Sequence, residues 1–145
     1  MAHIEKKIEV PADPHDVFGA LAAIENYPRY SKYIKSVVPL AHHGYRWKAG
    51  MWGLSITWEG VVTEIEPPHY FSWHCTKGFK NSGTLRVVPH SQGSLVMFSL
   101  EYDKAPQIVG RAVSMLLKPS TDRWIARQIL DSVEIYRAQL DQGKA

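Results

Sequence analysis

The segment GYRWKAGMWGLSITWEG (residues 44–60) decides how this sequence folds. Apolar and polar residues alternate along it with the period of two that is typical of β-strands. The pair Trp52-Gly53 interrupts the alternation with the chemistry of a tight turn, which predicts two antiparallel strands joined as a hairpin. The segment holds three tryptophans, and Trp73 follows in YFSWHCT. So much indole on neighbouring strands requires either a dense core or the wall of a cavity.

The hairpin lies within a longer run of predicted strands, from Ser36 to about Asp103. Six segments of strand-like pattern follow one another there, separated by short joints that contain Gly, Pro, Asn and Gln. Short joints favour antiparallel pairing of successive strands. HIEKKIEV (3–10) also alternates, which raises the prediction to about seven strands in one sheet. The positions expected to face inward are Tyr45, Trp47, Ala49, Met51, Ile56, Trp58, Phe71, Trp73, Cys75, Val96, Phe98, Leu100 and Tyr102.

Helical signals follow the first strand. Asp13 and Pro14 are typical of a helix start, and apolar residues continue at helical spacing to about Asn26. Pro28 then interrupts the pattern, and YPRYSKYI (27–34) is interpreted as a short second helix or a turn. Two short helices after strand one are therefore predicted.

The last part of the chain is also helical in pattern. PQIVGRAVSMLLK (106–118) is amphipathic, and Pro119 ends it. Apolar residues then recur at i, i+4 and i+8 through TDRWIARQILDSVEIYRAQLDQ (121–142). This spacing predicts a helix of about twenty residues and ~30 Å, long enough to cross the sheet. The order of elements predicts an α+β fold, a curved antiparallel sheet wrapped around a long C-terminal helix.

The composition indicates one soluble globular domain covering residues 1–145. Apolar residues make up 45% of the chain and charged residues 21%, which are ordinary globular values. With only Cys75 and no apolar run near the N-terminus, the chain is expected to be cytoplasmic and without an intrachain disulfide. The net charge of +3 is spread thinly along the sequence. Nucleic acid is therefore a disfavoured partner, whereas peripheral contact with a membrane stays open.

Motifs of several catalytic classes are missing from the sequence. There is no Gly-x-Ser-x-Gly elbow, phosphate-binding glycine loop or dinucleotide fingerprint, which argues against serine hydrolases, NTPases and Rossmann oxidoreductases. The seven histidines show no metal-ligand spacing, so neither a metal nor a cofactor is expected. His74 and Cys75 are strand neighbours that point to opposite faces, which disfavours a thiol–imidazole pair. Asn81 and Gly83 in KNSGT are interpreted as a hairpin turn.

Three stretches carry a resemblance to a known group of proteins. They are VPADPHDVFGALAAIENYPRY, WEGVVTEIEPPHYFSWHCTKGFKNSGTLRVVP and RWIARQILDSVEIYRAQL. Together they resemble the polyketide cyclase/dehydrase group of the START/Bet v 1-like (SRPBCC) superfamily, and IENYPRY is similar to its coenzyme Q-binding branch and to relatives described as ribosome-association toxins. The resemblance covers nearly the whole chain. It implies the helix-grip fold and an apolar cavity between the sheet and the long helix.

Three functional hypotheses are compatible with this resemblance. The favoured one is a protein that binds a hydrophobic small molecule, namely a lipid, an isoprenoid quinone or an aromatic polyketide-like metabolite. The second is an aromatic polyketide cyclase/dehydratase that works by general acid–base chemistry. Its candidate catalytic groups are Tyr102 and, if a bulge at Gly60 turns it inward, Glu59. The third is an interaction protein that recognises RNA or a ribosomal surface.

Candidate ligand-binding residues come from the inward strand positions and from the C-terminal helices. The indoles on the strands can line a cavity or pack against the C-terminal helix, and both interpretations stay open. Segment 106–118, with Gly110 as its hinge, is either a packed helix or a lid. Trp52 is predicted at the rim. The candidate ligand-binding residues are Trp47, Met51, Trp58, Trp73, Phe98, Tyr102, Val113, Leu116 and Ile129.

Overall fold

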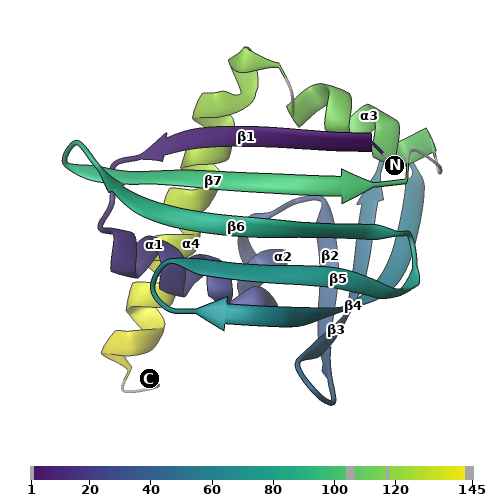
Figure 1. Ribbon diagram of the computed structural model, residues 1–145, viewed down its shortest axis with the longest axis horizontal. Helices are drawn as coiled ribbons and strands as arrows, with labels where there is room; N and C mark the ends of the chain where they lie inside the picture. The colour runs from purple at the N-terminus through teal and green to yellow at the C-terminus, as the bar shows by residue number, and fades with distance from the viewer. Residues whose placement is uncertain (1, 104–106, 117, 143–145) are drawn as a thin grey trace.

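Seven antiparallel strands form one curved sheet in the computed structural model, which describes residues 2–103, 107–116 and 118–142. The strands are β1 (Ala2–Val10), β2 (Ile34–Leu40), β3 (Gly44–Met51), β4 (Leu54–Glu66), β5 (Tyr70–Gly78), β6 (Asn81–His90) and β7 (Gly93–Tyr102). Their order is β1-β7-β6-β5-β4-β3-β2. The sheet bends so far that β2 and β3 run across the direction of β6 and β7 (Figure 1). The predicted meander is thereby confirmed.

Helices cover the inner face of this sheet. The first group is α1 (Pro14–Ala22), the 3-10 turn η1 (Ile24–Asn26) and α2 (Tyr27–Tyr30), and the second is α3 (Gln107–Leu116), η2 (Pro119–Thr121) and α4 (Asp122–Asp141). Figure 1 shows α4 crossing behind β1, β7 and β6, with α1 on the same side of the sheet. The α+β arrangement, with short helices after strand one and a long C-terminal helix, is the predicted one.

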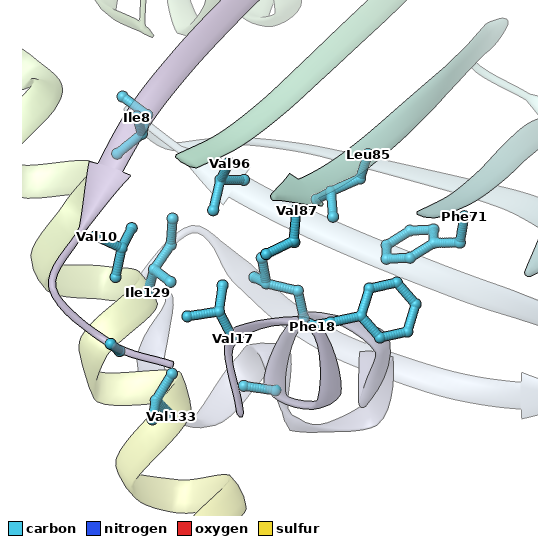
Figure 2. Close-up of a cluster of buried hydrophobic side chains, with 13 residues drawn as sticks. Ile8, Val10, Val17, Phe18, Phe71, Leu85, Val87, Val96, Ile129 and Val133 are labelled. Carbon is cyan, nitrogen blue, oxygen red and sulfur yellow. The ribbon is translucent and has the colours of Figure 1, made fainter. Parts of the chain in front are cut away.

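The main hydrophobic core lies between α1, α4 and the sheet. Figure 2 shows Phe18 pointing from α1 towards Phe71 on β5, and the two ring centroids are 6.0 Å apart in an edge-to-face arrangement. Ile129 of α4 is buried in this core, with 7% of its surface exposed. The core residues are Ile8, Val10, Ala12, Val17, Phe18, Ala20, Leu21, Phe71, Leu85, Val87, Val96, Ile129 and Val133.

A second, smaller core lies under α3. Ile4, Tyr102, Val109 and Val113 are buried together there. Partly buried apolar side chains surround them, namely Ala2, Met51, Ile56, Phe79, Phe98 and Leu100. In the structure α3 is therefore a helix packed on the sheet. The side chain of Leu116, a further predicted ligand contact, lies outside the described residues.

Polar contacts fix α4 to the N-terminal helical segment. The Asn26 side chain, which is buried, donates from Nδ2 to Oε1 of Gln139 at 2.9 Å and accepts from Nε2 of Gln139 at 3.0 Å. Arg137 Nη2 lies 2.8 Å from the Asp16 carboxylate. The first contact joins η1 to α4 and the second joins α1 to α4, and η1 and α2 lie against β2.

Candidate ligand-binding cavity

A cavity of about 250 Å³ lies between η1–α2 and the central strands of the sheet. Its lining is mainly aromatic and aliphatic, and it comprises Ile24, Tyr27, Tyr45, Trp47, Trp58, Gly60, Val61, Val62, Phe71, Trp73, His74, Phe79, Asn81, Leu85 and Leu100. None of the described residues of α4 belongs to this lining. The cavity thus differs in position from the expected one between sheet and C-terminal helix, because α4 packs through Ile129 and Val133 into the main core.

Two stacked indoles form one wall of the cavity. Trp47 on β3 lies directly opposite Trp58 on β4, and such cross-strand neighbours are close enough for their side chains to stack. The ring centroids are 5.8 Å apart and the planes differ by 3°. Tyr27 packs edge-to-face with Trp47, with ring centroids 5.4 Å apart, and Phe79 packs in the same way with Trp58 at a centroid distance of 6.0 Å. The two indoles therefore line a space, and their further ring contacts come from Tyr27 of α2 and from Phe79.

A third indole is held in place by a buried amide. Trp73 Nε1 donates to Oδ1 of Asn81 at 3.2 Å, and Asn81 Nδ2 donates to the Phe79 carbonyl at 2.9 Å. Trp73 also lies opposite Gly83 on β6. A Cβ at Gly83 would lie 2.5 Å from the Trp73 ring and 2.5 Å from the Ser99 carbonyl oxygen. The interpretation of Asn81 and Gly83 as a hairpin turn is wrong: both belong to β6, where one orients the indole and the other makes room for it.

The tyrosine hydroxyls at the cavity are neutral at ordinary pH. Tyr27 donates its hydroxyl proton to the Leu21 carbonyl at 2.7 Å, and burial raises the pKa of Tyr27 well above 10.0. Burial, and then the negative charge of Glu25, also raise the pKa of Tyr45. A general base must be deprotonated to accept a proton. These two hydroxyls can hydrogen-bond a guest, but they are poorly suited to act as bases.

Two half-buried tyrosines should make the fold sensitive to alkali. Burial raises the pKa of both Tyr27 and Tyr30 above 10.0, and for Tyr30 the nearby Tyr27 adds to the increase while Ser132 lowers it in part. The Ser132 hydroxyl donates to the Ile129 carbonyl at 2.6 Å, and no well-aligned bond to the Tyr30 hydroxyl is found among the described residues. The unfolded chain releases these protons first. Stability is therefore complete below pH 10.0 and should fall above it, by up to about 1.4 kcal/mol per pH unit for each tyrosine.

A tyrosinate absorbance titration, followed together with far-ultraviolet circular dichroism, measures this effect. Tyr27 and Tyr30 should ionise only as the secondary structure is lost, and Tyr30→Phe should leave one fewer such late group. If all seven tyrosines ionised near their ordinary pKa while the fold stayed intact, the described burial of Tyr27 and Tyr30 would be contradicted.

Neither candidate catalytic residue lines the cavity. The pairing of β4 with β5 does shift between Glu59 and Gly60, but Glu59 still points to the outer face. There its Oε2 accepts a hydrogen bond from Arg46 Nε at 3.0 Å, because Arg46 and Glu59 face each other one position along from the stacked indoles. Tyr102 is buried in the second core under α3.

Of the other predicted ligand contacts, some line the cavity and some lie in the two hydrophobic cores. Trp47, Trp58 and Trp73 line the cavity, whereas Met51, Phe98 and Val113 belong to the second core and Ile129 to the main one. Tyr27, Asn81 and Leu100 also line the cavity but were not predicted as ligand contacts. Leu100 was predicted only as an inward-facing strand position. Tyr27 contributes from a short helix, to which strand alternation does not apply.

A surface groove of about 360 Å³ adjoins the cavity. Ile24, Tyr45, Val62 and Phe71 line both spaces. The outer groove is bordered by the exposed residues His43, Thr63, Glu64 and Ile65. These four shared residues therefore form the boundary between the two spaces.

Within residues 2–103, 107–116 and 118–142, no three side chains of His, Cys, Asp or Glu converge as a metal site. Over the same part of the chain, no helix combines the length and the apolar character required to cross a bilayer.

The curved sheet and the long helix place this structure in the helix-grip class, and solved structures with the same fold support this. A START superfamily protein from Mycobacterium smegmatis is 18% identical, with a TM-score of 0.69 over 95% of this chain and 98% of that one. The Zhui aromatase/cyclase from Streptomyces sp. R1128 is 14% identical, with a TM-score of 0.65 over 96% and 95%. Ginseng major latex-like protein 151 from Panax ginseng is 14% identical, with a TM-score of 0.62 over 93% and 96%.

A family match carries the assignment further than these similarities of fold. The family described as "Polyketide cyclase / dehydrase and lipid transport" matches residues 1–136. The chain belongs to this family, and the resemblance to the polyketide cyclase/dehydrase group is confirmed. A comparison with curated proteins finds no match.

Proposed function

We propose that this protein binds a small aromatic molecule in the cavity between η1–α2 and the sheet. The observation that supports the proposal is the stacked pair of Trp47 and Trp58, which faces an unfilled space. Protein interiors are close-packed, with few voids larger than a water molecule. A space of this size walled by rigid, flat rings is suited to a flat apolar guest.

The volume of the cavity limits the size of the enclosed guest. An engineered apolar cavity of about 150 Å³ holds benzene, and drug-sized ligands occupy pockets of roughly 300–1,000 Å³. The 250 Å³ found here lies between these values and suits about two fused rings. A longer chain, such as an isoprenoid tail, would have to extend past Tyr45 and Val62 into the outer groove. Of the three ligand classes considered, an aromatic metabolite is the one favoured.

The polar groups of the wall indicate which atoms the guest carries. The Asn81 amide uses one N–H for the Phe79 carbonyl, and a primary amide has a second N–H to donate. The Tyr27 oxygen can accept a hydrogen bond while its own O–H donates to the Leu21 carbonyl. We therefore propose a guest with at least one carbonyl or hydroxyl group on an otherwise apolar ring system.

Binding has more support than catalysis on this geometry. The family description includes cyclases, dehydrases and lipid transport. However, Tyr102 and Glu59 both point away from the cavity, and Tyr27 and Tyr45 are held protonated. None of these four residues is suited to act as a general base in a cyclisation, and His74 is the remaining titratable side chain in the described lining that would have to do so.

Naphthol, a two-ring aromatic with one hydroxyl, is a suitable probe. We expect it to quench the intrinsic tryptophan fluorescence and to raise the melting temperature. At a naphthol concentration of 100 times Kd, binding adds about 2.7 kcal/mol of stability. For a domain of this size that corresponds to an increase of roughly 5–10 °C.

Filling the cavity should prevent this binding. Val62→Phe places a ring in the space and should weaken naphthol binding at least tenfold without unfolding the protein, since cavity-filling substitutions often stabilise. Val38→Phe makes the same change on the exposed face of β2 and should bind naphthol like the wild type. A wild-type protein that naphthol neither quenches nor stabilises, or a Val62→Phe variant with unchanged affinity, would contradict the proposal.

A further inference from the structure

The turn between β3 and β4 carries a tryptophan that its backbone does not favour. Trp52 has φ of +54° and Gly53 has φ of +76°. In this left-handed region Gly and Asn are the favoured residues, and a bulky side chain is an outlier. The Trp52 side chain is 51% exposed, so burial in a core does not account for its presence. An indole kept on the surface at a strained position indicates contact with something outside the chain.

Basic side chains surround this turn. A shallow groove beside it is lined by Lys32, Lys35 and Lys48, and these are the charged residues among its described lining. The stem of Lys35 lies across Gly50, where an added Cβ would be 3.2 Å from Lys35 Cε. From the other side, Arg111 of α3 places its guanidinium 5.6 Å from the centre of the Trp52 ring. Four cations from three segments of the chain thus gather around one exposed indole.

The apolar part of this surface extends beyond the indole. Leu54, two residues further along the chain, is 47% exposed and lines the same groove. An apolar tip ringed by cations matches the boundary of an anionic bilayer, where Trp lies at the level of the headgroups and Lys and Arg lie near the phosphates. Single-stranded nucleic acid is instead bound by a series of aromatic platforms along a basic groove. Trp52 provides one such exposed platform beside this groove.

We propose that the surface formed by Trp52, Leu54, Lys32, Lys35, Lys48 and Arg111 docks the protein on anionic lipid bilayers. The proposal is independent of the cavity, because neither Trp52 nor any of the four cations lines it. Its test is co-sedimentation with vesicles of phosphatidylcholine alone or with about one third phosphatidylglycerol. Binding should require the anionic lipid and should decrease as salt shortens the Debye length.

Trp52→Asn separates docking from folding. Asn-Gly is a favoured pair for a two-residue hairpin turn, so this variant should be at least as stable as the wild type, and yet it should bind anionic vesicles about fivefold to tenfold more weakly. Leu140→Asn, which removes an exposed apolar side chain on α4, should bind like the wild type.

Charge reversal tests the electrostatic part. Lys48→Glu should weaken vesicle binding more than tenfold, since each cation near an anionic surface contributes about fivefold. Lys7→Glu changes the net charge of the protein by the same amount at an exposed position of β1, and it should weaken vesicle binding much less. Naphthol binding should be unchanged in both variants, which distinguishes failure of docking from failure of the cavity proposal.

Three outcomes would overturn the docking proposal. The first is that the wild-type protein does not sediment with anionic vesicles. The second is that Trp52→Asn and Lys48→Glu bind as well as their control variants. The third is that the Lys48→Glu variant loses binding to a single-stranded RNA oligonucleotide but still binds the vesicles. This result would assign the surface to RNA.

Discussion

Phe18→Ala is expected to lower the free energy of unfolding by about 3–5 kcal/mol. Phe18 is 3% exposed and joins α1 to the sheet through its contact with Phe71 (Figure 2). Truncation removes the buried ring and opens a void that the strands on either side cannot collapse to fill, because their pairing fixes their separation. Urea denaturation, followed by circular dichroism, measures the loss as a lower midpoint at an unchanged m-value.

Two variants make this result interpretable. Phe18→Leu keeps an apolar side chain in the site and should cost clearly less than the alanine variant. Val38→Ala, on an exposed position of β2, should change the stability by about 0.5 kcal/mol or less. If Phe18→Ala were no more harmful than Val38→Ala, the packing of α1 on β5 described above would be incorrect. Because Phe71 also lines the cavity, Phe18→Ala should weaken naphthol binding as well.

Gly83→Ala is expected to lower the stability by about 3 kcal/mol, the upper end of the range for overpacked sites. The added methyl group would collide with the Trp73 ring and with the Ser99 carbonyl, each 2.5 Å away. The Ser99 oxygen belongs to the backbone of the adjacent strand, which cannot move without disturbing the pairing of β6 with β7. The clash with this oxygen therefore remains as strain, and the indole, which forms part of the cavity wall, has to move as well. Naphthol affinity should therefore fall at least tenfold in the same variant.

Gly110→Ala is the matched control for this change. A Cβ at Gly110, within α3, meets no described atom within 4 Å, and alanine is preferred to glycine in helices by roughly 0.5–1 kcal/mol. The same chemical substitution should thus stabilise at Gly110 and destabilise at Gly83, as measured by thermal unfolding of both proteins. Equal stability and equal naphthol affinity for Gly83→Ala and the wild type would show that Trp73 does not lie against Gly83.

The sequence by itself determined the strands and helices of this protein and the side of the sheet on which the three indoles lie. Alternation over 44–60 and the Trp52-Gly53 turn produce the β3–β4 hairpin, and the same alternation places Trp47, Trp58 and Trp73 on the inner side. These properties are predictable because the strand period and the turn conformation depend on residues close together in the chain. The helical spacing of 121–142 predicts α4 for the same reason.

The tertiary structure alone decided where the cavity lies and which residues meet there. Strand parity cannot tell which part of a curved sheet a helix covers, so Ile129 was expected at a ligand and is instead in the core. Likewise, the role of Gly83 depends on an indole of another strand, and the cations around Trp52 come from around the start of β2, from β3 and from α3. The physical reason is that sheet curvature, register shifts and helix docking arise from contacts between residues far apart in the chain, which no local pattern encodes.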